Sequence, residues 1–330
     1  MSDRFAKYKA AGVQMAAVWG DRDATTEKIC RLAEEARNQG AELIVFPEVI
    51  IPGSPHWIWS SPEDYDRYVE LYKNSVEIPS NTTQRLCKIA QEIQAFLIVG
   101  VNERRGRVLY NTMLFIDEKG QLLGAHRKLM GTYVEKIIWA MGGGDGLRVF
   151  DTRFGVIGGL ICRENFSNLA RHVLASEGEQ VHAGIWLAGS ARRGAHFSKC
   201  MEAACITHAL SSSSYVIGVQ SCASGREIEM FRLKGPGGWS AIISPQGEIV
   251  AGPLPEGEGI VVGEIDLESA IRAYPRRDEI GYHGRPDVFK VLVNREPYIQ
   301  ELGHFSPRRE RIKITRQPIP HKKKNKEKKI

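Results

Sequence analysis

The chain has 330 residues, 42% of them hydrophobic and 25% charged, a composition typical of a water-soluble globular protein with a substantial core. No stretch approaches the roughly 18 apolar residues of a membrane-spanning helix, and the first twenty residues lack the basic segment and apolar run of a secretory signal. Six scattered cysteines without a Cys-x-x-Cys pair argue against a disulfide framework and against the usual cysteine metal sites. We therefore expect a reducing, cytoplasmic setting.

The net charge of +6 is concentrated at the end of the chain. Residues 306–330 hold eleven lysines and arginines and two glutamates, so residues 1–305 are mildly acidic. Such a charge run predicts a disordered tail, which either contacts nucleic acid or an anionic surface or, the interpretation we favour, is simply solvated. We predict one domain over residues 1–305 and a basic tail over 306–330.

Continuous apolar runs alternate with helical patterns along the domain. In chain order, the sequence predicts a strand over 8–18, a helix over 25–40 that begins at a threonine and stops at Gly40, a strand over 41–48, a helix over 80–94, a strand over 95–103, hairpins turning at 118–120 and 153–155, a helix over 167–177, a strand over 181–188, a helix over 196–210, a strand over 215–222 and a hairpin turning at 245–247. Long apolar strands between amphipathic helices indicate an α/β protein with buried sheets.

Three chemically versatile side chains lie at the carboxyl ends of predicted strands. Glu48 ends the run AELIVFPE, Lys128 follows QLLGAHR, and Cys162 ends the run RFGVIGGLIC. A cysteine in an apolar run is usually inert core, and a strand-ending Glu or Lys is usually surface. In α/β sheets, however, the carboxyl ends of strands are where functional side chains gather, so the three together predict a site.

Four segments resemble the nitrilase branch of the carbon–nitrogen hydrolase family. VFPE (45–48) resembles the segment of its glutamate base, and GGLICRENF (158–166) resembles that of its cysteine nucleophile. HRKLMGTYVEKIIW (126–139) is similar to its lysine segment, with a second glutamate at Glu135. GYHGRPDVF (281–289) resembles a late block that favours nitrilases over the family's amidases.

The resemblance covers about residues 8–295 and implies both a fold and an activity. The fold is a four-layer α-β-β-α sandwich without cofactor or metal, whose subunits form a homodimer or a longer spiral. The activity is hydrolysis of an organic nitrile to the carboxylic acid and ammonia. Cys162 would be the nucleophile, Glu48 the base and Lys128 the charge stabiliser, with Glu135 either part of this set or only a structural partner of Lys128.

The chemistry of these residues agrees with that activity. A neutral thiol is a poor nucleophile and needs a base or a positive charge nearby. Glu48 would accept the proton of Cys162, whose thiolate the dipole of the following helix would favour. Attack on a nitrile gives a thioimidate, water releases ammonia to leave a thioester, and a second water gives the acid. Lys128 would stabilise the negative charge that develops.

The sequence departs from the family around the substrate pocket. Arg163 stands where nitrilases usually have a tryptophan, and it either faces the pocket to bind a polar or anionic substrate group or turns away to pair with a carboxylate such as Glu164. The segment after the base, IPGSPHWIWSSP (51–62), carries Trp57 and Trp59. These two rings either line the pocket or fill the core under a loop.

Two other functions remain open at this point. One is amide or N-carbamoyl hydrolysis by the same residues, and the other is a non-catalytic binding or filament-forming protein that keeps the fold. The presence of Glu48, Lys128 and Cys162 together argues against the second. A thiol-protease pair of Cys162 with His126 is disfavoured, because His126 precedes Lys128 by two residues and lies one contact away at most. The other five cysteines are expected to be packing residues.

Overall fold

The computed structural model describes residues 5–281 and 283–298, so the predicted tail over 306–330 and the domain boundary at 305 lie outside the described residues. No helix within these two ranges is both long and apolar enough to cross a membrane.

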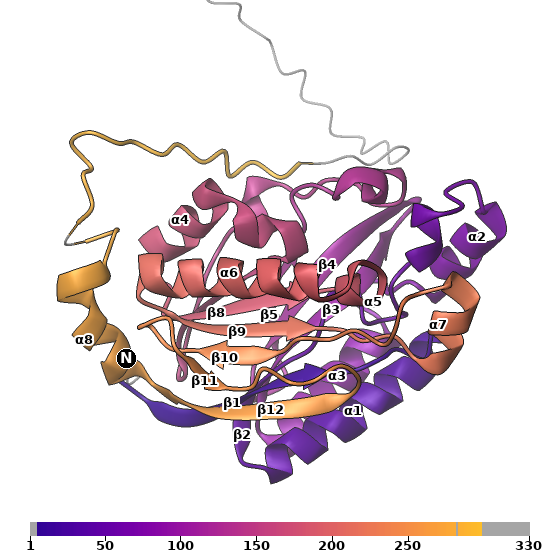
Figure 1. Cartoon of the computed structure of the whole chain (residues 1–330), viewed down its shortest axis with the longest axis horizontal. Coiled ribbons are helices and arrows are strands. Elements are labelled where there is room, and N and C mark those ends of the chain that lie inside the picture. Colours follow the sequence, from indigo (N-terminus) through magenta and orange to yellow (C-terminus); the bar gives the residue numbers. More distant parts are fainter. Residues whose placement is uncertain (1–4, 282, 299–330) are drawn as a thin grey trace, which may run out of the picture.

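Two six-stranded sheets form the centre of the fold (Figure 1). The first has the order β12-β1-β2-β3-β4-β5 and the second the order β11-β10-β9-β8-β7-β6. The strands of the first sheet are β1 (Lys7–Gln14), β2 (Ala41–Val45), β3 (Phe96–Arg105), β4 (Val108–Ile116), β5 (Leu122–Arg127) and β12 (Gly259–Asp266). Those of the second are β6 (Phe150–Thr152), β7 (Gly155–Ile161), β8 (Val181–Trp186), β9 (Tyr215–Gln220), β10 (Ala241–Ile243) and β11 (Ile249–Ala251).

The two sheets share one pattern: a parallel centre with antiparallel strands outside it. Strands β1, β2 and β3 run parallel in the first sheet, and β7, β8 and β9 run parallel in the second. The carboxyl ends of β2 and β7, which precede Glu48 and Cys162, therefore belong to the parallel core of their sheets, where functional side chains are expected.

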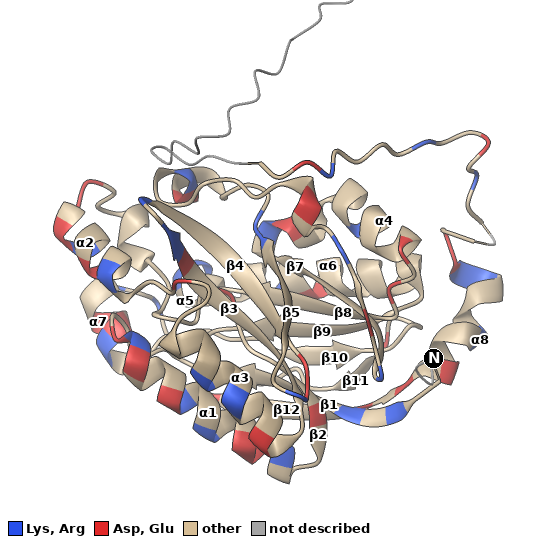
Figure 2. Cartoon of the chain, turned by 180° about the vertical axis from the view of Figure 1, so that it is seen from behind, with Lys and Arg blue, Asp and Glu red and all other residues tan. Residues whose placement is uncertain are grey.

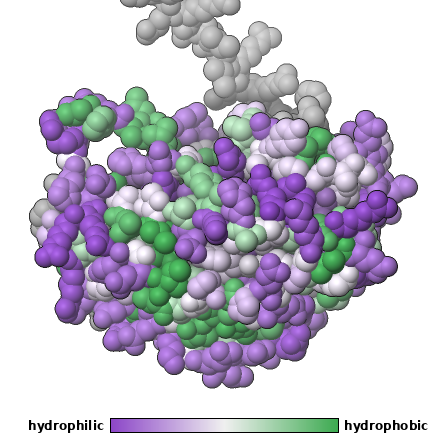
Figure 3. Space-filling view, in the orientation of Figure 1, coloured by the Kyte–Doolittle hydropathy of each residue, from purple (hydrophilic) through white to green (hydrophobic). Residues whose placement is uncertain are grey.

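Helices cover the outer faces of both sheets. Helices α1 (Arg22–Asn38) and α3 (Asn81–Ile93) pack on the first sheet, and α4 (Asn168–Ser176) and α6 (Ala195–Ser212) pack on the second. The remaining helices are α2 (Tyr65–Asn74), α5 (Gly189–Arg193), α7 (Gly225–Phe231) and α8 (Leu267–Arg277). Charged residues are frequent along α1 (Figure 2), and on the face seen in Figure 3 apolar residues form separate patches between polar ones. The predicted four-layer sandwich is thus confirmed.

The pleat of the strands divides the core into two layers. On β2, Leu43 and Val45 point between the sheets, while Ile44 points toward α1 and α3. Side chains of a strand alternate between its two faces, so a strand buried on both sides reads as a continuous apolar run. This is why AELIVFPE shows no polar alternation.

The predicted elements are recovered with shifts at their ends, and four helices were omitted. Helix α1 does not begin at a threonine: its N-cap is Asp21, whose side chain accepts a hydrogen bond from the Ala24 N–H. Helices α2, α5, α7 and α8 were not predicted. Helix α2 leaves only Leu71 buried, so its apolar pattern is weak, and α8 contains Pro275, a residue that normally ends a helix.

Candidate active site

Lys128 lies between two buried carboxylates. Its Nζ donates a hydrogen bond to Glu48 Oε1 at 2.7 Å and another to Glu135 Oε2 at 2.8 Å, and the three side chains are at most 2% exposed. Glu48 accepts two further hydrogen bonds, from Asn111 Nδ2 at 2.7 Å and from the Leu187 N–H at 2.8 Å. Charges are tolerated in a protein interior when they are paired and hydrogen-bonded, as here.

The sequence places these side chains at the ends of elements. Glu48 follows β2, Lys128 follows β5, and Glu135 lies in a 3₁₀ turn, Tyr133–Ile137. The chain at Glu48 passes directly over Gly100 of β3, where a Cβ atom would lie 2.7 Å from the Glu48 Cα. Only glycine at position 100 leaves room for this path, so the backbone of the candidate base depends on a residue of the neighbouring strand.

Cys162 directly follows β7 and has a left-handed backbone with φ of +53°. It opens a 3₁₀ turn, Cys162–Phe166, and α4 begins only at Asn168. The prediction that a helix dipole favours the thiolate of Cys162 is therefore wrong, because a single short turn aligns few peptide dipoles. A non-glycine residue at positive φ is strained and persists where its surroundings fix it, which is common at functional sites.

Glu164 joins the Cys162 turn to the Lys128 segment. Its Oε1 accepts a hydrogen bond from the Leu129 N–H at 2.7 Å. Its Oε2 accepts one from the Ile161 N–H at 2.9 Å and lies 3.0 Å from His126 Nε2. His126 thus contacts the candidate site through Glu164, one contact away as its position predicted. Glu164 holds the residues beside Cys162 and Lys128 at a fixed separation.

The electrostatics favour a thiol that keeps its proton at rest. Burial raises the pKa of Cys162 well above its ordinary value and Glu48 raises it further, whereas Lys128 and the Arg163 backbone N–H act in the opposite direction. Burial raises the pKa of Glu48, against the attraction of Lys128. Burial alone would lower the pKa of Lys128, but Glu135 and Glu48 outweigh it and raise that pKa well above the usual value. The arrangement combines an ammonium with a carboxylate of enhanced basicity, as proton transfer from a thiol requires.

Arg163 is exposed, and its expected partner Glu164 is already occupied by His126 and two backbone N–H groups. The guanidinium lines a pocket of about 400 Å³ together with Tyr133 and Phe166. The interpretation that Arg163 pairs with Glu164 is therefore wrong.

The two tryptophans after the base differ in their surroundings. Trp57 is 3% exposed and packs edge-to-face on Trp19, with ring centroids 6.0 Å apart, so it belongs largely to the core. Trp59 is half-buried between Tyr133, at a centroid distance of 6.1 Å, and the Arg192 guanidinium, 3.8 Å from its ring. Both rings line a second pocket of about 650 Å³, which His56, Arg67, Arg192 and Phe231 also line.

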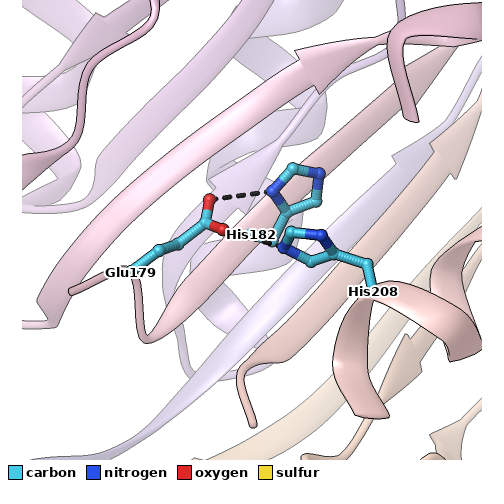
Figure 4. Close-up of side chains that lie close together, drawn as sticks. All are labelled: Glu179, His182 and His208. Atoms are coloured by element: carbon cyan, nitrogen blue, oxygen red, sulfur yellow. Dashed lines mark hydrogen bonds and ion pairs between the residues drawn. The ribbon is translucent and has the colours of Figure 1, made fainter. Parts of the chain in front are cut away.

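A separate polar cluster lies in the second sheet and is the group of described residues best suited to hold a metal ion. Glu179, His182 and His208 are buried, and one possible ligand atom from each lies within 4.8 Å of the others (Figure 4). It forms no contact with Lys128 or Glu48.

Sequence reasoning missed several supporting residues. Glu164 and Asn165 stand in the segment GGLICRENF, where Glu164 was considered only as a partner of Arg163 and Asn165 was given no role. Their acidic and amide side chains beside a strand-ending cysteine were the available signal. Asn111 and the Leu187 N–H gave no signal, because an asparagine within a strand and a backbone group have no distinctive pattern.

Comparison with known proteins identifies the family. The family model described as "Carbon-nitrogen hydrolase" matches residues 9–275. A nitrilase of Bacillus sp. (strain OxB-1) is 38% identical over 306 residues, covering 88% of this chain and 89% of that protein. An aliphatic nitrilase of Rhodococcus rhodochrous is 35% identical over 302 residues, covering 87% of this chain and 82% of that protein.

Solved structures agree on the fold. The crystal structure of a carbon–nitrogen hydrolase from Helicobacter pylori G27 matches with a TM-score of 0.73 at 20% identity, over 87% of this chain and 98% of that chain. The fold, the sequence match over most of the length and the nitrilases among its relatives lead to one conclusion: this chain belongs to the nitrilase branch of the carbon–nitrogen hydrolase family.

Proposed function

We propose that this chain hydrolyses an organic nitrile to the carboxylic acid and ammonia. The observation that carries the proposal is Lys128 held by two buried carboxylates and coupled electrostatically to the thiol of Cys162. Relatives named as nitrilases, at 31–38% identity over most of the chain, support the same reaction.

In the proposed first step, Glu48 takes the proton of Cys162 as the sulfur attacks the nitrile carbon, and Lys128 stabilises the negative charge that develops on the nitrogen. Glu48 then passes this proton to the nitrogen, which gives a neutral thioimidate and restores the Glu48 carboxylate. Glu48 next takes a proton from a water molecule as the water oxygen adds to the thioimidate carbon. The nitrogen receives this proton and the one left on the added oxygen, the carbon–nitrogen bond breaks, and ammonia departs to leave a thioester. A second water cleaves the carbon–sulfur bond, releases the acid and returns the proton to the thiol.

In this proposal Glu135 belongs to the catalytic set through Lys128. Its Oε2 also accepts a hydrogen bond from the Thr132 N–H at 2.8 Å, which fixes the carboxylate without a second cation. The Glu135 charge keeps Lys128 protonated while Glu48 is neutralised by the thiol proton. A lysine paired only with Glu48 would lose its counter-ion in the step in which its charge is needed.

The substrate side of the proposal rests on the two pockets. In this proposal Arg163, Trp59 and Trp57 bind the part of the substrate beyond the nitrile, and Trp57 does so from its largely buried position. The second pocket has three arginines and one acidic residue in its lining, and the buried His56 Nε2 has no hydrogen-bond partner among the described residues. An excess of arginines over acidic residues around aromatic walls favours polar or anionic nitriles over purely hydrophobic ones.

Assembly and location complete the proposal. We expect a homodimer or a longer spiral formed through the outer helices, which fits the 66% exposure of Leu169 on α4. All six cysteines are free, which fits a reducing cytoplasm. Light scattering during size-exclusion chromatography measures the assembly directly.

Ammonia release over a matched panel of nitriles and their amides tests the function. We expect ammonia to be released from nitriles by the wild type and by the control variant Cys205→Ala, and not by Cys162→Ala, because Cys205 is an apolar packing residue of the core. Release from amides alone would assign the amidase or carbamoylase activity instead. No release from either panel would favour a non-catalytic protein, and an acyl adduct on Cys205 would contradict the assignment of Cys162.

A further inference from the structure

The buried cluster Glu179, His182 and His208 is connected to the Cys162 turn through one residue, Asn165. Glu179 Oε1 lies 2.8 Å from His182 Nδ1, and Glu179 Oε2 lies 2.8 Å from His208 Nε2 (Figure 4). On its other side, His182 Nε2 lies 2.9 Å from Asn165 Oδ1. His208 makes no hydrogen bond to Asn165, so only one of the two histidines extends toward the turn.

Asn165 fixes the direction of its hydrogen bond with His182. Its Nδ2 donates to the carbonyl oxygens of Leu160, at 3.1 Å, and Cys162, at 3.0 Å. The amide oxygen must therefore be the atom that faces His182, and it can only accept. His182 Nε2 consequently carries a proton and donates it to Asn165.

The other ring nitrogen of His182, Nδ1, faces the carboxylate of Glu179. Burial would raise the pKa of Glu179, but the attraction of His182 and His208 outweighs burial and lowers that pKa to about 2. An ionised carboxylate only accepts, so both ring nitrogens of His182 face hydrogen-bond acceptors. Burial and the charge of His182 lower the pKa of His208 to about 4, so His208 is neutral and donates from Nε2.

We propose that His182, anchored by Glu179, is a positioning residue that holds Asn165 and thereby the left-handed backbone of Cys162. The inference rests on the proposed role of Cys162 as nucleophile. Two carbonyls on either side of the strand-to-turn junction are bound by one amide, and the hydrogen bond from His182 Nε2 keeps that amide from rotating. The sequence makes room for this anchor: a Cβ atom on Gly158 would lie 2.2 Å from Glu179 Oε1.

The expected consequence is a defect in the chemical step. Without the donor on His182, Asn165 can turn away and the turn can relax toward ordinary dihedral angles, which moves the sulfur relative to Lys128 and Glu48. A misplacement of about 1 Å at the reacting atoms can cost about 100-fold in rate. Substrate binding depends on the pocket walls, so KM should change little.

The test compares two histidines of the same cluster. His182→Met removes the donor to Asn165 at similar volume, and we expect kcat about 100-fold lower with KM nearly unchanged. Alkylation of Cys162 by iodoacetamide, followed by mass spectrometry of its peptide, should slow in parallel. His182→Gln, whose amide N–H can reach Asn165, should recover part of the loss. The matched control is His208→Phe, which removes the other contact of Glu179 and should keep kcat near the wild-type value.

Asn165→Asp provides a second test if His182→Met does not fold. Aspartate has nearly the same shape as asparagine but cannot donate to the Leu160 and Cys162 carbonyls. A near-native kcat in this variant would overturn the proposal. Equal losses of kcat in His182→Met and His208→Phe would mean that the cluster acts only through stability. A stoichiometric divalent metal ion in the purified protein, lost in both histidine variants, would replace the proposal with a metal site. If the wild type hydrolyses no nitrile, only the proposed function fails, because the alkylation rate still reports on Cys162.

Discussion

Replacement of Glu135 by glutamine separates a catalytic from a structural role of the second glutamate. The glutamine oxygen can still accept the hydrogen bonds from Lys128 Nζ and from the Thr132 N–H, both 2.8 Å long in the wild type. What is lost is one negative charge. Lys128 still donates from an ammonium, but the bond from the Thr132 N–H becomes neutral. A hydrogen bond to a charged group contributes about 1.5–3 kcal/mol and a neutral one about 0.5–1.5, so the free energy of unfolding should fall by about 1–2 kcal/mol.

The effect on the base has a definite sign. The Glu135 charge raises the pKa of Glu48, although less than burial does, so its removal lowers that pKa. Glu48 accepts a proton only while ionised, and the acid limb of kcat/KM should therefore move to lower pH, with one pKa unit corresponding to about 1.4 kcal/mol. A weaker base should also lower the maximal rate. The apparent pKa belongs to the coupled set and not to Glu48 alone.

The assay is the pH profile of ammonia release, with unfolding in urea measured on the same samples. Glu92→Gln is the matched control, because Glu92 pairs with Lys88 on the exposed side of α3 and should change neither quantity by more than about 0.5 kcal/mol. An unmoved acid limb combined with lower stability would refute the catalytic role and leave Glu135 as a structural partner of Lys128.

Three more predictions concern the pocket and the buried histidines. Arg163→Trp should shift kcat/KM from polar or anionic nitriles toward hydrophobic ones by about ten- to a hundredfold, and an unchanged ranking of substrates would exclude Arg163 from the pocket. Trp59→Leu should reorder substrates, whereas Trp57→Ala should mainly destabilise the fold by about 3–5 kcal/mol; the same ranking in both variants would refute the distinction. His56 and His208, with pKa values of about 4 in the folded state because burial lowers both, should each cost stability as pH falls from about 6.5 toward 4. As the pH falls, each histidine takes up its proton in the unfolded protein before it does so in the folded protein. This lowers the free energy of unfolding by up to roughly 3 kcal/mol for each histidine. Urea midpoints that stay constant over this pH range would contradict the assignment.

Much of the fold followed from the sequence because it depends on local pattern. The strand AELIVFPE and the helix over 80–94 have an apolar periodicity that leaves one arrangement, and the observed β2 and α3 match it. The missed helices show the limit of this reasoning. Helix α8 keeps its place by packing Leu267, Ala270 and Ala273 against the rest of the domain in spite of Pro275, and packing of this kind has no local signature.

The reactive residues of the candidate site were predicted from the sequence, but the groups that hydrogen-bond to them were not. Glu48, Lys128 and Cys162 could be predicted because side chains of these types stand at the ends of apolar runs. Asn111 and the Leu187 N–H act only because strands distant in sequence bring them to Glu48. The helix dipole expected at Cys162 failed for a related reason: the length of the turn before α4 depends on the hydrogen bonds of Glu164 and Asn165, which become visible only in three dimensions.

The pairing of β1 with β12 has a consequence for how the chain folds during synthesis. The two strands align along their whole length, from Lys7 opposite Asp266 to Gln14 opposite Gly259, so the first sheet receives its edge strand only after some 250 further residues have been made. At roughly 5–20 residues per second, β1 waits about 10–50 s with one edge open on the ribosome. During that interval the exposed edge can pair with another nascent chain. A ribosome-bound fragment ending before residue 259 should therefore depend on chaperones more than one that includes β12.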